Sequence, residues 1–139
     1  MIVLDTNVIS ETLKPAPSDT VMKWLRSREP LDVFITTITQ AEVLYGIELL
    51  PAGKRRNTLR VEIEKVFSEE FHDRILGFDE AAARAYARIA GECKAMGRPI
   101  AEFDAMIASI CRSRQATIAT RNVKHFEHCG ISAVNPWRD

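Results

Sequence analysis

Short apolar runs alternate with longer stretches of helical periodicity along the chain. Ile2–Leu4, Leu31–Thr36, Thr117–Ala119 and Ile131–Val134 are apolar runs of the length of buried strands, and Arg74–Leu76 is a candidate edge segment. Strands separated by helices favour parallel pairing, because parallel strands need a long crossover connection. The pattern therefore predicts an α/β fold, namely a three-layer α/β/α sandwich with a mainly parallel central sheet.

Two amphipathic helices are predicted between Leu31–Thr36 and Arg74–Leu76. One spans Thr39 to Leu50 and ends at Pro51-Ala52-Gly53. Its expected buried face consists of residues about one helical turn apart, which are Ala41, Leu44, Tyr45 and Leu49. The other helix spans Lys54 to about Phe71. Its expected inward side chains are Leu59, Ile63, Val66 and Phe67.

Two further helices are predicted in the second half of the chain. A long alanine-rich helix begins after Asp79, whose side chain suits an N-cap. Gly97-Arg98-Pro99 then breaks the chain before the last helix. The apolar stripe of that last helix consists of Phe103, Met106, Ile107, Ile110 and Cys111.

Composition limits the setting in which such a fold works. A length of 139 residues with 46% hydrophobic residues predicts a single domain over residues 1–139, with a core that needs no disulfides. The cysteines Cys93, Cys111 and Cys129 are odd in number and lack paired zinc spacing, which suits a reducing cytosol. No leader pattern and no membrane-length apolar run is present, so we expect a cytoplasmic protein without membrane contact.

Three acidic residues occur at comparable places in this pattern. Asp5 ends the first strand, Glu42 lies in the opening turn of the helix after the second strand, and Asp104 lies in that of the helix after Pro99. The carboxyl ends of parallel strands share one edge of the sheet, so these carboxylates can converge. An oxygen-only site suits Mg²⁺ or Mn²⁺, and the absence of cysteine or histidine in the set disfavours zinc.

Each acid also has a purely structural explanation. Asp5 can cap the helix that follows it, and Thr39-Gln40-Ala41-Glu42 spells a capping box. Asp104 can simply lie in the positive field of a helix N-terminus, an effect of about 0.3–1 kcal/mol. Glu102 can take that role instead, and spacing alone does not choose between Glu102 and Asp104.

Five short motifs span the chain from its first residues to its last few. They are Leu4-Asp5-Thr6-Asn7-Val8, Thr39-Gln40-Ala41-Glu42, Phe103-Asp104-Ala105-Met106-Ile107-Ala108, Ala119-Thr120-Arg121-Asn122 and Asn135-Pro136-Trp137. In order and spacing they resemble PIN-domain proteins, and more narrowly the VapC and FitB-like ribonuclease toxins of bacterial type II toxin–antitoxin pairs. The resemblance implies that Asp5, Glu42 and Asp104 are metal-binding acids, which favours Asp104 over Glu102.

The same resemblance implies an endoribonuclease that depends on Mg²⁺ or Mn²⁺. Its catalytic residues would be Asp5, Glu42, Asp104 and Asn122, while Thr6, Thr120 and Arg121 would orient water, ligands or substrate. Asn122 offers a neutral amide where many relatives have an acid. Relatives with asparagine there often have aspartate three residues later, and this chain has His125. Three formal negative charges rather than four are expected to weaken a second metal site.

Partners are implied mainly by the resemblance. They are an RNA substrate, a cognate antitoxin in a groove formed by the helices between Thr39 and Phe71, a second copy of the chain, and operator DNA reached only through the antitoxin. The 19 basic and 19 acidic residues give no net charge that would indicate a polyanionic partner. Two local groups of basic residues can bind RNA phosphates or form ordinary solvated surfaces. The first group consists of Lys54, Arg55, Arg56 and Arg60. The second group consists of Arg112, Arg114, Arg121, Lys124 and His125. Trp24 and Trp137 are predicted in the core or a dimer interface.

Two other classes of protein remain as alternatives. A phosphohydrolase of the haloacid-dehalogenase type also has an acid after its first strand, but it requires a second aspartate two residues later, where this chain has Asn7. A non-catalytic PIN-fold binding module would act through its complex with antitoxin and DNA. Asn122 and His125 keep that second alternative open.

Overall fold

A five-stranded sheet, parallel throughout, organises the computed structural model, which describes all 139 residues. Its order is β3-β2-β1-β4-β5. The strands are β1 (Ile2–Leu4), β2 (Val33–Thr36), β3 (Ile75–Leu76), β4 (Thr117–Ala119) and β5 (Ala133–Val134). The predicted parallel sheet is thus confirmed, and its two outer strands have only two residues each.

Successive side chains of the central strands enter two separate cores. Val3 and Ile118 belong to one buried apolar cluster, whereas their neighbours Leu4 and Ala119 belong to the other. This alternation is the two-residue period of a strand. A parallel sheet is normally covered on both faces, and the apolar character of these runs satisfies that requirement.

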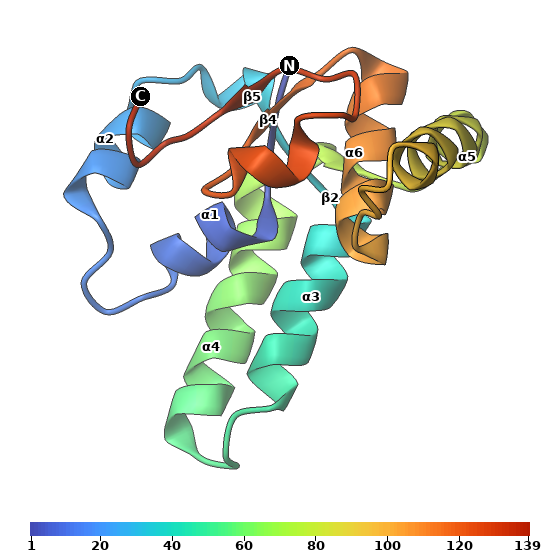
Figure 1. Ribbon diagram of the computed structural model, residues 1–139. Coiled ribbons are helices and arrows are strands. Elements are labelled where there is room, and N and C mark those ends of the chain that lie inside the picture. The colour runs from blue at the N-terminus through green and yellow to red at the C-terminus, as the bar shows by residue number, and fades with distance from the viewer.

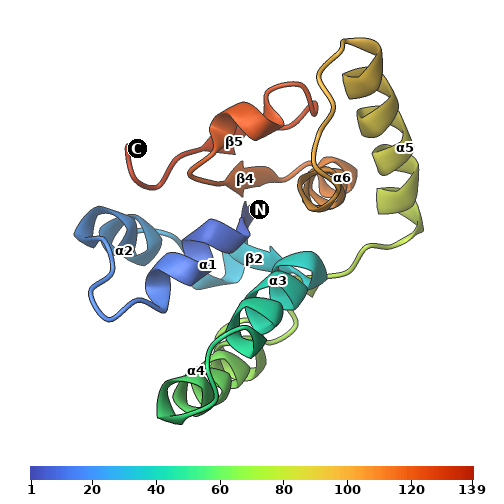
Figure 2. The same ribbon diagram turned by 60° about the horizontal axis from the view of Figure 1, so that its bottom comes forward.

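Helices form a layer on each face of the sheet, which confirms the three-layer prediction (Figures 1 and 2). The first layer contains α1 (Thr6–Thr12), α2 (Asp19–Arg26), α3 (Thr37–Glu48) and α4 (Lys54–Lys65). The second layer contains α5 (Glu80–Ala95) and α6 (Glu102–Arg114). Short helical segments cover Pro30–Asp32, Val66–Glu70 and Val123–Phe126. No helix combines the length and the apolar content that crossing a membrane requires.

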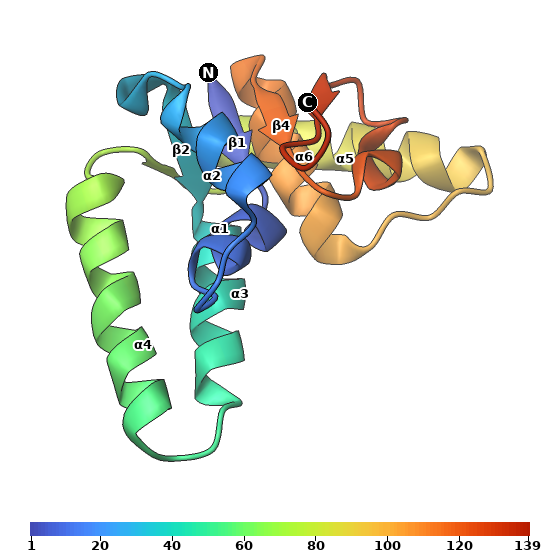
Figure 3. The same ribbon diagram turned by 90° about the vertical axis from the view of Figure 1, so that its left-hand side faces the viewer.

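Helices α3 and α4 form an antiparallel hairpin that extends beyond the sheet (Figure 3). The prediction for the buried face of α3 was wrong. Ala41, Tyr45 and Leu49 are exposed and Leu44 is only partly buried, while the inward side chains are Thr39, Val43 and Ile47. Apolar residues surround this helix, so their period alone does not define one buried face. The inward face predicted for the α4 segment is largely confirmed, since Leu59, Ile63 and Phe67 are buried.

Predictions for the other helices had mixed outcomes. Asp79 caps α5 as expected, because its Oδ1 accepts a hydrogen bond of 2.9 Å from the backbone of Ala82. In α6 the predicted stripe holds at Ile107, Ile110 and Cys111 but not at Phe103, which is 51% exposed. Helix α2 was not predicted from the sequence; Ser18 caps it, and Val21 and Trp24 anchor it in the core.

The order of the strands determines where a ligand crevice forms. From β1 the chain moves outward through β2 to β3, and then returns to β4 on the other side of β1. The direction of winding therefore reverses between β1 and β4. In open parallel sheets, ligands bind at the carboxyl ends of the strands at this reversal point.

Candidate active site

Asp5 lies at the reversal point, directly after β1. Its side chain is 5% exposed and makes two kinds of contact. Oδ1 accepts a hydrogen bond of 2.8 Å from the backbone N–H of Thr6, which caps α1. Oδ2 accepts a hydrogen bond of 2.8 Å from the Thr120 hydroxyl at the end of β4. Helix capping and a place in the site therefore coexist, because they use different oxygens.

Glu42 does not cap the N-terminus of α3, so the predicted capping box is wrong. Helix α3 begins at Thr37, and its cap is Thr36, whose hydroxyl accepts a hydrogen bond of 3.1 Å from the backbone of Thr39. Glu42 consequently lies in the second turn rather than the opening one. Its Oε1 instead accepts a hydrogen bond of 2.7 Å from the Thr6 hydroxyl. A contact between distant segments thus holds this carboxylate beside the turn that carries Asp5.

Asp104 lies in the first turn of α6, as predicted. Its carboxylate is partly buried, and its Oδ2 is 3.2 Å from Nδ1 of His125. Glu102, the alternative acid, is exposed and does not line the pocket described next. The structure therefore brings Asp104, and not Glu102, to the crevice.

These carboxylates line a single pocket of about 380 Å³ whose walls contain no hydrophobic residue. It forms where the N-terminal halves of α1, α3 and α6 come together (Figure 1). The lining residues are Asp5, Thr6, Asn7, Ser10, Glu42, Asp104, Asn122 and His125. All four predicted catalytic residues are among them, although three of the elements that carry them are far apart in the sequence.

Two lining residues, Asn7 and Ser10, were not predicted as part of the site. Asn7 donates through Nδ2 to Asp5 Oδ2 at 3.3 Å, and its Oδ1 accepts from the backbone N–H of Arg121 at 3.3 Å. The two residues are three positions apart on α1, so they share the face that adjoins Asp5. That polar spacing in the first motif is the pattern from which they could have been predicted.

Thr120 and Arg121 are neighbours with different surroundings. The Thr120 side chain is fully buried, and its hydroxyl also accepts a hydrogen bond of 3.0 Å from the backbone of Asn122. The Arg121 guanidinium instead lies over the ring of Trp137, 5.0 Å from its centroid. Thr120 therefore fixes the orientation of Asp5, whereas the Arg121 side chain is not part of the pocket wall.

The electrostatic balance of the pocket favours a bound cation. Burial raises the pKa of Asp5, and the nearby charge of Asp104 adds to this effect, while hydrogen bonds from Thr120 and Thr6 oppose it. The pKa of Glu42 is also raised, mainly by burial and then by the charges of Asp5 and Asp104. Carboxylates that destabilise one another's charged forms gain stability from a cation placed between them.

The donor set fits a hard divalent ion. Three carboxylates and the amide of Asn122 supply only oxygen ligands, and no thiol lines the pocket. No three histidine, cysteine, aspartate or glutamate side chains stand together as a ready ligand cluster. Glu42 is hydrogen-bonded to Thr6, and Asp104 pairs with His125. Mg²⁺ suits such a site, because it keeps several waters and commonly takes only one or two carboxylates directly.

Comparison with known proteins agrees with this fold. The family model described as PIN domain matches residues 2–130. The chain is 42% identical to Toxin FitB of Neisseria gonorrhoeae, with 100% of both chains covered. It is 36% identical to VapC ribonuclease Y4jK of Sinorhizobium fredii, covering 99% of this chain and 98% of the relative. It superposes on a solved structure of FitAB bound to an IR36 DNA fragment with a TM-score of 0.94 and 41% identity, covering 100% of this chain and 97% of that chain.

The carboxylate pocket at the reversal point and the match over residues 2–130 define a PIN domain. Within that class, the chain belongs to the VapC/FitB family of toxin ribonucleases from type II toxin–antitoxin systems.

Proposed function

We propose that the toxin is a Mg²⁺- or Mn²⁺-dependent endoribonuclease whose site consists of Asp5, Glu42, Asp104 and Asn122. The observation that carries this proposal is that carboxylates from three distant segments line one polar pocket at the β1/β4 reversal point. The relatives named as ribonucleases support RNA as the substrate. Asp5 and Asp104 are the residues that would hold the principal ion, with Glu42 or Asn122 beside them.

The role of each residue of the site follows from its contacts. Thr120 and the Thr6 backbone hold Asp5 in one orientation, and the Thr6 hydroxyl does the same for Glu42. A bound divalent ion supplies charge compensation to the phosphate and lowers the pKa of a water. Glu42, whose pKa is raised, is suited to accept a proton from the attacking water. Attack by water on the phosphorus, with the P–O3′ bond breaking and the 3′-oxygen leaving as a hydroxyl, would leave a 5′-phosphate.

The proposed partners are an antitoxin, a second copy of the chain, and DNA reached through the antitoxin. The solved relative that contains both FitA and FitB with DNA supports this arrangement. In this chain, a groove of about 700 Å³ lies between the α1–α2 segment and α4 and is lined by apolar residues such as Leu13, Leu25 and Val66. An amphipathic helix from an antitoxin would bury its apolar face there. A cytoplasmic location is part of the same proposal.

The proposal is tested by incubating the purified protein with structured RNA in Mg²⁺, in chelator, and as the Asp104→Asn variant. Cutting that requires Mg²⁺ and is lost in the variant supports the nuclease. Release of phosphate from small esters, without RNA cutting, would support a haloacid-dehalogenase type of reaction instead. Binding of the antitoxin without cutting of any RNA would favour a non-catalytic binding module.

A further inference from the structure

A second pocket adjoins the carboxylate pocket on the side of α6. Its volume is about 320 Å³, and it lies between the Arg98–Ala101 loop and residues 124–128. Asp104 and His125 line both pockets. The two pockets are therefore neighbours that share one wall, and a ligand extending out of the first would enter the second.

The second pocket has the opposite charge. Arg98, Lys124, His125 and His128 line it, and Asp104 is its only acid. The Asp104 carboxylate already faces His125 at 3.2 Å. Neither Arg98 nor Lys124 forms an ion pair with an acid of this chain, and both are exposed. Their positive charges therefore remain available to an external anion.

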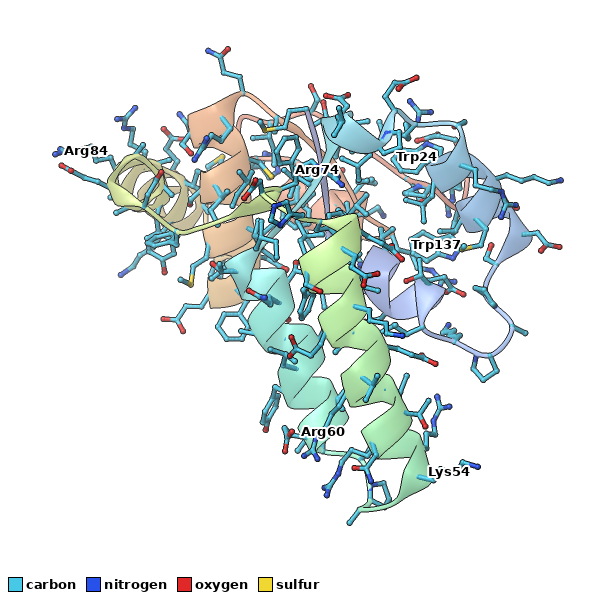
Figure 4. The ribbon with its side chains drawn as sticks, turned by 180° about the vertical axis from the view of Figure 1, so that it is seen from behind. Trp24, Lys54, Arg60, Arg74, Arg84 and Trp137 are labelled. Atoms are coloured by element: carbon cyan, nitrogen blue, oxygen red, sulfur yellow. The ribbon has the colours of Figure 1, made fainter.

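Several other basic side chains of the protein are already neutralised or lie elsewhere. Arg112 is 3.6 Å from Glu92, and Arg60 is 2.7 Å from Glu48. Lys54 and Arg60 also lie at the distal end of the α3–α4 hairpin, away from the sheet (Figure 4). Of the cluster predicted at the start of α4, Arg55 lines a pocket that shares Ser10 and Glu42 with the carboxylate pocket, whereas Arg98 and Lys124 together line the pocket on the α6 side.

We propose that the basic pocket formed by Arg98, Lys124, His125 and His128 binds the phosphate of the RNA strand that flanks the phosphate being cut. This inference rests on the proposed nuclease function and extends it to the direction in which the strand leaves the site. Arg98 and Lys124 make the main contacts, because they are the two full positive charges of the pocket.

The charge distribution gives the physical reason. A pocket with three carboxylates and one imidazole repels a polyanion wherever a bound metal does not compensate it. A cationic neighbour offsets that repulsion and fixes the register of the strand, since phosphate contacts position a nucleic acid without selecting its sequence. The volume is at the lower end of the roughly 300–1,000 Å³ of ligand pockets, which suits one nucleotide unit.

The test uses a double variant that carries both Arg98→Gln and Lys124→Gln. The matched control is Arg84→Gln. Arg84 lies on the outer side of α5, where it pairs with Glu80 at 2.6 Å (Figure 4). For a short single-stranded RNA, we expect the double variant to raise KM about tenfold and to leave kcat within about twofold, as expected for lost surface ionic contacts. Arg84→Gln is expected to match the wild type in both constants.

Binding supplies a readout that does not depend on cutting. The affinity for a fluorescent RNA oligonucleotide is measured in chelator over a range of salt concentrations. Because the pocket is proposed to neutralise one phosphate, its loss is expected to reduce the salt slope by about 0.7 on a single strand. An unchanged slope and affinity would overturn the basic pocket, even if the wild type cuts RNA. Failure of the wild type to cut RNA would instead overturn the proposed function.

Discussion

Replacing Thr120 with valine isolates one hydroxyl group in the centre of the site. Thr120 is 0% exposed, and its Oγ1 donates to Asp5 Oδ2 at 2.8 Å while accepting from the Asn122 backbone at 3.0 Å. Thr120→Val keeps the branched shape and removes both hydrogen bonds, together with a longer one of 3.4 Å that Oγ1 accepts from Asn7 Nδ2. The Asp5 carboxylate then remains buried with one donor fewer, and the Asn122 N–H loses its acceptor.

The loss of stability follows from these two bonds. A hydrogen bond to a charged group contributes about 1.5–3 kcal/mol, and one between neutral groups contributes about 1 kcal/mol. The expected loss is therefore about 2.5–4 kcal/mol, a large share of the roughly 5–15 kcal/mol by which domains are stable. At roughly 3–5 °C per kcal/mol for a chain of 139 residues, Tm should fall by about 10 °C.

Thr120→Val should also move the activity profile. The Thr120 hydrogen bond lowers the pKa of Asp5, so its removal raises that pKa further. Because the ionised carboxylate is the form that binds a cation, the acidic limb of the cleavage profile should shift to higher pH. Urea unfolding and pH-dependent cleavage measure the two effects. The control Thr120→Ser keeps the hydroxyl, and the reasoning is refuted if it is destabilised as much as Thr120→Val or if Thr120→Val unfolds like the wild type.

Three further predictions concern the charge of the pocket and the exposed face of α3. In metal-free buffer at pH 7.5, Asp5→Asn should melt at a higher temperature than the wild type, and the difference should vanish toward pH 4. The sign follows because burial raises the folded pKa of Asp5, so its stabilising contribution is complete below the unfolded pKa and is lost as the pH rises through the folded one; equal melting at pH 7.5 would contradict it. Adding Mg²⁺ should raise the Tm of the wild type by mass action and leave that of Asp104→Asn nearly unchanged, as differential scanning fluorimetry would show. Tyr45→Ser with Leu49→Ser should change the free energy of unfolding by less than about 0.5 kcal/mol, since both side chains are more than 60% exposed, and urea titration would detect a larger loss.

The sequence predicts the sheet and the meeting of the acids because both depend on strong local patterns. Ile2–Leu4 and Thr117–Ala119 are short runs that form buried strands, and an acid or hydroxyl follows each of them. Parallel pairing then requires Asp5 and Thr120 to lie at the same edge, whatever the details of the helices.

Local sequence preferences could not predict the residue at which α3 begins. Thr36 and Thr39 both satisfy the preference for an N-cap, and Glu42 completes a capping box with the second of them. Only the contact with Thr6, which is distant in the sequence, favours the earlier start and frees the Glu42 carboxylate. The inward face of α3 was predicted wrongly for a different reason: apolar residues surround the helix, and packing against the rest of the fold selects Val43 and Ile47 among them.

The brevity of β3 and β5 has a consequence for how the protein behaves when it accumulates. Open sheet margins are templates on which a neighbouring molecule can add a strand, and from there fibres grow. Here each margin offers only two residues of extended backbone, too few to seed such growth. The protein can therefore be kept at high concentration without polymerising through its own sheet.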